Sequence, residues 1–441
     1  MRPAHALLLA GLSLVPLPVG AVRAQDAPAE VDDAAEALVK ALASESAAAR
    51  RAAEDALVAL GESARATLES HAASDDAEVR ARVRAVLRRL DEAARGATHA
   101  SLTWAGLRGD PMRTGVAGGA IPAEKPTRLW STDVAGLGLM QGSVVPGDER
   151  IVCLSNDGIV RTFATHDGAR GWLANLESPI TASAVLASDR LVVPTRGGLV
   201  ALDVRTGRRV WEEPSDYGCE AAPAVSGGRV FAAFRSVGIR ALDLVTGERL
   251  ADWPLAPSGA LLVDGDLVVA GTEDGHLVRL DAASRRVLWR IDLGSAPNMG
   301  PTLAAPGAVA VLARDRYLRV VGAEHGRTLW ERRLPNASRS ESLAASAGRL
   351  FLTDSAGALR AFDAGTGAQL WSRHEGMLEM GGPCATPERV LWGTRGRLMC
   401  RDAASGVWVW RLDLPAVDDA VPVVRDGVVY VLTNRELIAL R

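Results

Sequence analysis

A nine-residue motif recurs along most of this chain and restricts its fold more than any other feature. The motif reads Asp-x-x-Thr-Gly-x-x-x-Trp and is complete in residues 203–211 and 363–371. Its last position recurs eight times, in steps of 38 to 42 residues. Short β-rich runs separated by glycines and charged turns fill each interval, and a period near 40 residues is typical of a β-propeller. We therefore predict a mainly β fold, an eight-bladed β-propeller with four-stranded blades, over residues 126–441.

The residue types of the motif predict how the blades are built. Aspartate, threonine and glycine favour a tight turn between the third and fourth strands, in which glycine supplies a positive φ and side-chain oxygens bind backbone amides. The tryptophan lies on the outer strand, where its apolar face can pack into the next blade. The third blade departs from the pattern, since Ala251 holds the tryptophan position and Trp253 follows it. We expect seven tryptophans to dock neighbouring blades: Trp130, Trp172, Trp211, Trp289, Trp330, Trp371 and Trp410.

The two ends of the repeat region complement each other. Trp130 belongs to a fourth-strand segment that no first, second or third strand precedes. The chain ends at residues 438–441, in a third strand that no fourth strand follows. Pairing of these segments would complete the last blade and remove open sheet edges. We therefore predict that the N-terminal strand closes the last blade.

Three segments precede the propeller. Residues 1–24 have the basic start, short apolar run and small-residue cleavage site of a signal peptide, with no cysteine near the cleavage point. Residues 30–95 have helical periodicity and predict a small all-α module, in which residues 54–90 resemble a HEAT-type helical pair. A docking module and a small spacer both fit this region. Residues 96–125 are rich in glycine and proline and predict a linker, which we interpret as a strap anchored by Trp104 rather than as a binding loop.

Composition and residue spacing argue against several classes of protein. The formal net charge of −3 is not that of a strongly basic nucleic-acid binder. The seven histidines are scattered singly, so we expect no metal site. There is no Gly-x-Ser-x-Gly elbow and no phosphate loop, so no catalytic residue is predicted. The four cysteines have no zinc-type spacing and predict buried free thiols: Cys153, Cys219, Cys384 and Cys400.

The repeat, extended to Ala-x-Asp-x-x-Thr-Gly-x-x-x-Trp as in residues 201–211 and 361–371, resembles the pyrroloquinoline-quinone-type propeller repeat. This family includes quinone-dependent alcohol and glucose dehydrogenases, and also a non-enzymatic scaffold of the outer-membrane β-barrel assembly machinery. The dehydrogenases typically carry an adjacent pair of cysteines over the quinone and a Glu/Asn/Asp set that holds calcium. This sequence has no adjacent cysteines, and its repeats are short and uniform. We therefore expect no cofactor, and pyrroloquinoline quinone with calcium belongs only to the alternative below.

The preferred hypothesis is a non-enzymatic exported scaffold, monomeric and without a transmembrane anchor, that binds a protein partner in the cell envelope. This places the protein in the periplasm or outside the cell. The alternative is a divergent quinoprotein oxidoreductase that depends on pyrroloquinoline quinone. A solvated polar rim without a partner also fits the residues. Propellers usually bind through loops that enter the inner strands, and the rim residues that we expect to contact a partner are Gln141, Asp216, Tyr217, Glu220, Asn298, Arg339, Glu341, Glu379, Asp418 and Asp419.

Overall fold

The chain folds into two compact units, Met1–Ala94 and Arg95–Arg441. The computed structural model describes residues 28–441 apart from the positions that follow: 45, 47–49, 51–52, 55, 58–59, 73, 75, 77–78, 81, 85, 88–114, 116–117, 136, 141–143, 236, 299, 337–342, 376–380, 395 and 416–420. The predicted strap lies largely outside the described residues, and so does its proposed anchor Trp104.

The N-terminal unit is helical, as its periodicity predicts. Its helices are α1 (Pro28–Ala41), the 3-10 helix η1 (Gly61–Ala64) and α3 (Arg65–His71). Two ion pairs join distant parts of the unit: Glu36 with His71 at 3.3 Å, and Glu54 with Arg82 at 2.7 Å. Ten buried apolar side chains form a core of its own: Ala35, Val39, Leu42, Ala53, Leu57, Ala64, Leu68, Val79, Val83 and Val86.

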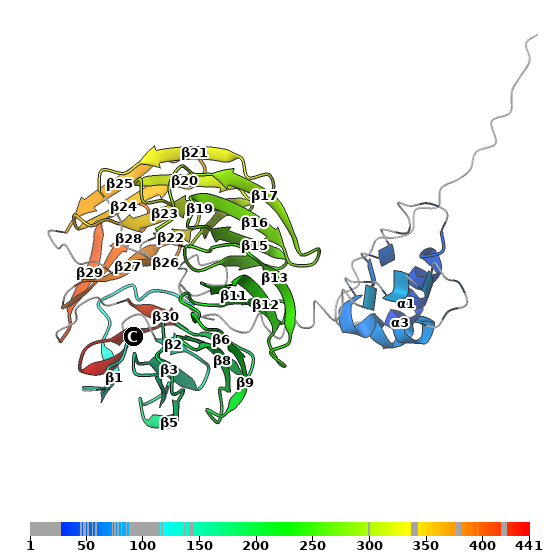
Figure 1. Ribbon diagram of the computed structural model, residues 1–441, viewed down its shortest axis with the longest axis horizontal. Coiled ribbons are helices and arrows are strands. Elements are labelled where there is room, and N and C mark those ends of the chain that lie inside the picture. The colour runs from blue at the N-terminus through cyan, green and yellow to red at the C-terminus, as the bar shows by residue number, and fades with distance from the viewer. Residues whose placement is uncertain are drawn as a thin grey trace, which may run out of the picture. The chain divides into compact units, whose positions relative to one another are not determined.

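The C-terminal unit is an eight-bladed β-propeller (Figure 1). Each blade is an antiparallel sheet of four strands. The first four blades are β2 (Val145–Pro146), β3 (Arg150–Leu154), β4 (Ile159–Ala164) and β5 (Arg170–Asn175); β6 (Val185–Ala187), β7 (Arg190–Thr195), β8 (Gly198–Asp203) and β9 (Arg209–Pro214); β10 (Ala224–Ser226), β11 (Arg229–Phe234), β12 (Gly238–Asp243) and β13 (Arg249–Trp253); and β14 (Leu262–Asp264), β15 (Leu267–Gly271), β16 (His276–Asp281) and β17 (Arg286–Asp292).

The next three blades follow the same order along the chain. They are β18 (Thr302–Ala305), β19 (Ala308–Leu312), β20 (Tyr317–Gly322) and β21 (Thr328–Arg333); β22 (Leu343–Ser346), β23 (Arg349–Thr353), β24 (Ala358–Asp363) and β25 (Gln369–His374); and β26 (Cys384–Ala385), β27 (Arg389–Thr394), β28 (Arg397–Asp402) and β29 (Trp408–Asp413).

The eighth blade is built from both ends of the repeat region, which confirms the predicted ring closure. Its strands are β30 (Val423–Arg425), β31 (Val428–Leu432), β32 (Glu436–Leu440) and, on the outside, β1 (Arg128–Asp133). Thr127 and Arg441 exchange two backbone hydrogen bonds of 2.7 and 2.9 Å. The segment just before β1 lies against the same blade, because Gly118 forms a parallel bridge with Arg425.

Burial follows each strand's distance from the centre of the blade. The second strands are almost wholly buried, since neighbouring blades cover both of their faces, as in β11 and β19. The outer strands alternate instead, as in β1, β5 and β21. This period of two keeps one face against the next blade and turns the other outward.

Candidate partner-binding rim

The repeated motif forms the turns that the sequence predicts. In the second blade, the Asp203 carboxylate accepts hydrogen bonds from the amide and the hydroxyl of Thr206, at 2.8 and 2.7 Å. Gly207 follows with a φ of 72°. The hydroxyl of Thr206 holds the pKa of Asp203 below its usual value. The same bonds recur at Asp243, Asp363 and Asp402 with Thr246, Thr366 and Ser405.

Six motif tryptophans reach the motif turn of the next blade, and the seventh, Trp410, reaches Pro122 in the segment before β1. The Trp371 indole N–H donates to the Ala403 carbonyl at 3.1 Å, and its ring covers Gly406, where a Cβ would lie 2.7 Å from the ring. Seven indoles donate to a carbonyl in this way, over distances of 2.8–3.1 Å: Trp130, Trp172, Trp211, Trp289, Trp330, Trp371 and Trp410. These joints fix the blades side by side and so set the spacing of the loops that the blades carry.

Two kinds of loop share one face of the propeller, which we call the rim face. They are the entry loops, which lead into the first strand of each blade, and the second turns, which join its second and third strands. Up-and-down antiparallel order brings both to the same end of the blade. Isolated bridges pin the entry loop to the second turn in five blades: Leu139 with Ser155, Ile180 with Thr195, Cys219 with Phe234, Pro257 with Thr272, and Pro297 with Ala313.

The structure brings some of the expected rim residues together. Asp216, Tyr217 and Glu220 lie in one entry loop, that of the third blade, and all three are exposed. Tyr217 is 63% exposed, which is unusual for so large an aromatic side chain. Asn298 lies apart from them, in the entry loop of the fifth blade. The other expected residues fall outside the described residues: Gln141, Arg339, Glu341, Glu379, Asp418 and Asp419.

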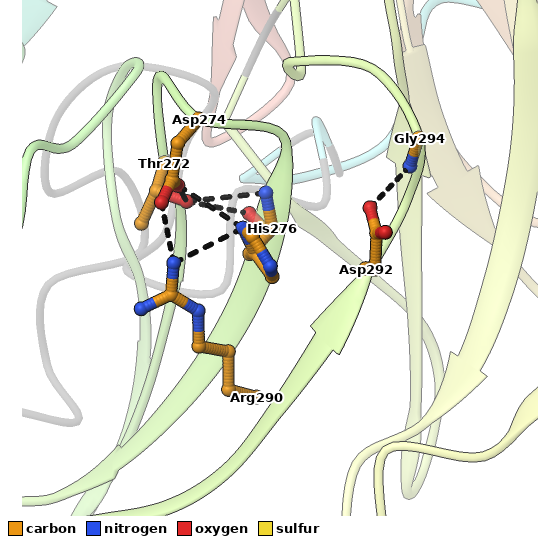
Figure 2. Close-up of polar contacts among 6 residues, drawn as sticks. All are labelled: Thr272, Asp274, His276, Arg290, Asp292 and Gly294. Carbon is orange, nitrogen blue, oxygen red and sulfur yellow. Dashed lines mark hydrogen bonds and ion pairs between the residues drawn. The ribbon is translucent and has the colours of Figure 1, made fainter.

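The second turns also contribute to this face, and the sequence prediction missed them. In the fourth blade the Thr272 hydroxyl donates to Asp274 at 2.5 Å, and Asp274 also binds Arg290 (Figure 2). His276 Nδ1 lies 3.1 Å from both the Asp274 carboxylate and the Arg290 guanidinium. Asp292 pairs with His276 in the register of β16 and β17, and apart from this cluster its carboxylate accepts a 2.7 Å hydrogen bond from the Gly294 amide (Figure 2).

Opposite charges pair on this face within and between blades. Glu220 and Arg235 join an entry loop to the second turn at 3.1 Å, and Glu273 and Arg314 join two second turns at 3.5 Å. The hydroxyl of Thr272 holds the pKa of Asp274 below its usual value, so Asp274 stays ionised well below neutral pH. Some charged side chains of this face therefore pair with one another, both within a blade and between blades.

No metal or thiol chemistry is assembled in the described part of the chain. No three His, Cys, Asp or Glu side chains of the described residues gather closely enough to hold a metal ion. The four cysteines are buried and free, as predicted, and burial raises the pKa of Cys153 and of Cys219 to about 12. Cys384 and Cys400 lie on β26 and β28, which β27 separates. The donor set that an adjacent cysteine pair and a calcium cage require is thus not found among these residues.

These features define the class of the protein. It is an eight-bladed propeller with short loops, in which tryptophan rings of one blade pack on motif glycines of the next. Residues 120–290 and 273–391 match the family described as "Outer membrane protein assembly factor BamB", and the chain belongs to this family. The assembly factor BamB of Burkholderia pseudomallei (strain K96243) is 25% identical over 191 residues, which are 39% of this chain and 50% of that protein. The chain spans about half the length of the curated relatives it matches.

Solved structures share the fold. The crystal structure of BamB from Moraxella catarrhalis superposes with a TM-score of 0.61 at 20% identity, and the match covers 72% of this chain and all of that one. A quinohemoprotein alcohol dehydrogenase from Comamonas testosteroni has a TM-score of 0.65 at 14% identity, with 79% and 84% covered. Among the described residues, no helix combines the length and apolarity that a membrane crossing requires.

Proposed function

We propose that this protein is a non-enzymatic exported scaffold that binds a protein partner in the cell envelope through its rim face. The observation that carries the proposal is the construction of that face. Short entry loops are held to the second turns beneath them, and they present polar side chains and the exposed Tyr217. Tyrosine on a rigid support is a favoured anchor in protein interfaces, because it buries a large area at little entropic cost.

The remaining parts of the proposal follow from the sequence. Residues 1–24 direct export and leave a mature protein in the periplasm or outside the cell. The mature protein is a monomer that requires neither a cofactor nor nucleic acid. The helical unit fits a second docking module and a small spacer equally well, and membership of the BamB family supports a role in the envelope.

Capture from envelope extract tests the proposal. The mature protein serves as bait beside a variant that combines Tyr217→Ala with Glu220→Ala. Arg205→Ala is the matched control, because Arg205 is exposed in a motif turn on the opposite face. We expect one partner to be retained by the wild type and by the control, and to be lost with the rim variant. Equal retention by all three proteins would refute the role of the rim.

The alternative, a divergent quinoprotein oxidoreductase, rests on the fold shared with the quinohemoprotein dehydrogenases. Addition of pyrroloquinoline quinone and calcium, followed by measurement of binding and of dye-linked alcohol oxidation, distinguishes the two. The scaffold proposal predicts neither binding nor turnover. Saturable quinone binding with turnover would establish the enzyme instead.

A further inference from the structure

One second turn carries an arginine where equivalent turns carry glycine. The turns of the first, fourth, fifth and sixth blades share one hydrogen-bond pattern, in which the fourth residue donates its amide to the carbonyl of the first. Three of them have glycine at that fourth position, Gly158, Gly275 and Gly357, with φ angles of 89°, 86° and 79°. The fifth blade has Arg316 there, with a φ of 69°.

This substitution opposes the intrinsic preference of the backbone. A bulky side chain in the left-handed region is an outlier, and such an outlier persists where the surrounding structure holds it. Here the Leu334 amide donates to the Arg316 carbonyl at 2.8 Å, which ties the turn to the end of β21. The position therefore holds an arginine that the turn itself does not need.

Arg316 and Arg333 face one open pocket on the rim face. The pocket has a volume of ≈ 380 Å³ and is lined by Arg316, Arg333, Leu334 and Pro335. Arg316 Nη1 donates to the Pro335 carbonyl at 3.0 Å, which orients the guanidinium and leaves its other N–H groups available. Arg333 is exposed at the end of β21.

Two carboxylates near the pocket, Asp315 and Glu331, pair with another arginine, Arg319. Arg319 binds Asp315 through two hydrogen bonds of 3.2 and 2.6 Å and lies 3.3 Å from Glu331. Neither Arg316 nor Arg333 has an acidic partner in the described part of the chain. Two guanidinium groups that have no acidic partner among the described residues line one pocket, and their geometry matches the fork of an oxyanion.

We infer that Arg316 and Arg333 bind a carboxylate that a protein partner presents on an acidic side chain. This inference rests on the proposed function, because it supplies the chemistry of the partner that the rim face receives.

Arg316→Gly tests the site without damage to the fold, because the equivalent turns already contain glycine. Arg285→Gly is a matched control. Arg285 is exposed in the motif turn of the fourth blade, on the opposite face, has a φ of 59° and also takes a position where other repeats have glycine. Both variants remove one positive charge from a left-handed residue, and Arg316→Gly also removes the hydrogen bond to the Pro335 carbonyl. Arg333→Gln tests the second guanidinium.

The probe is fluorescein-labelled hexaglutamate, with binding followed by fluorescence anisotropy at low ionic strength. We expect Arg316→Gly and Arg333→Gln each to weaken binding by about tenfold, as loss of one charge-assisted hydrogen bond predicts, and Arg285→Gly to bind like the wild type. Equal weakening by Arg316→Gly and Arg285→Gly, or no weakening by Arg316→Gly, would overturn the site. Inorganic phosphate and free glutamate are then compared as competitors of the labelled probe. If phosphate displaces the probe at a much lower concentration than glutamate does, the site binds phosphate and the proposed carboxylate ligand is wrong.

The two proposals fail in different ways. If hexaglutamate binds through Arg316 but envelope extract yields no partner, the site stands and the scaffold function falls. If a partner is captured equally by the wild type and by Arg316→Gly, and hexaglutamate binding does not depend on Arg316, the function stands and this site falls.

Discussion

At the scale of single residues, the tryptophan of one blade and the glycine of the next depend on each other. The Trp371 ring lies where a Cβ on Gly406 would stand, so the tryptophan fits only because that residue has no side chain. The joint between the third and fourth blades lacks both members. Ala251 replaces the tryptophan, and Arg285 replaces the glycine of the following turn. Trp253 is 3% exposed and fills the core near Ala251 instead.

Trp371→Ala should destabilise the propeller by about 3–5 kcal/mol, because it empties a buried site between two blades. Trp371 is 6% exposed. Urea unfolding followed by fluorescence measures the change. Leu370→Ala is the control, since Leu370 is the neighbouring residue and is 46% exposed. Equal midpoints for the two variants would show that the tryptophan does not join the blades.

Gly406→Ala tests the same joint from the opposite side. Its Cβ would lie 2.7 Å from the Trp371 ring on a backbone with a φ of 66°, so both overlap and strain oppose it. We expect a loss of at least about 2 kcal/mol in the free energy of unfolding. Gly228→Ala is a useful comparison, because Gly228 has a φ of 73° and no atom near the site of its Cβ. If Gly406→Ala and Gly228→Ala lower the free energy of unfolding by the same amount, backbone strain alone explains the effect and the tryptophan contact contributes nothing.

At the scale of elements, the motif turns carry a pH dependence. Hydrogen bonds from Thr206, Thr366 and Ser405 hold the pKa values of Asp203, Asp363 and Asp402 below their usual values. A carboxylate with a lower pKa in the folded state stabilises the fold above its unfolded pKa of about 3.9, and this contribution is lost as pH falls through the folded value.

The unfolding midpoint should therefore fall between pH 5 and pH 3, measured in urea at each pH. We expect a variant with both Asp203→Asn and Asp363→Asn to lose less of its remaining stability over this range, because these positions no longer titrate. Asp216→Asn, which removes a carboxylate from an entry loop, controls for the change in charge. If the unfolding midpoint of the double variant falls as steeply with pH as that of the wild type, the turns do not carry the pH dependence.

The elements show which parts of the molecule the sequence can predict. Asp203, Thr206 and Gly207 interact within five residues of each other, so their turn is readable from local pattern, and the 40-residue period gives the number of blades. Pairing of β1 with β32 could be predicted because the two segments are incomplete in complementary ways. The local sequence does not indicate the pair of Arg316 and Arg333, because Arg333 is brought close only by the pairing of β20 with β21.

At the scale of the whole molecule, the ring is closed by one strand pairing between segments that are far apart in sequence. β1 pairs with β32 over five residues of each, from Arg128 with Leu440 to Asp133 with Glu436. No disulfide joins these two strands, so closure of the blade depends on their backbone hydrogen bonds and on the shared core beneath them.

Deletion of residues 436–441 removes β32, which leaves β1 without its partner strand and β31 paired with β30 alone. We expect the protein to lose its single cooperative unfolding transition, because the first and seventh blades then border an open edge. Differential scanning calorimetry compares this deletion with Glu436→Ala, which keeps the strand. A deletion variant that melts at the wild-type temperature would show that the ring does not need its closure.

The central claim, that the rim face receives a protein partner in the cell envelope, is tested most directly by photo-crosslinking in cells. A photoreactive phenylalanine replaces Tyr217 on the rim face in one variant and Arg205 on the opposite face in the other. The account predicts a discrete crosslinked adduct from position 217 and none from position 205. Adducts of equal yield from both positions, or none from position 217, would contradict it.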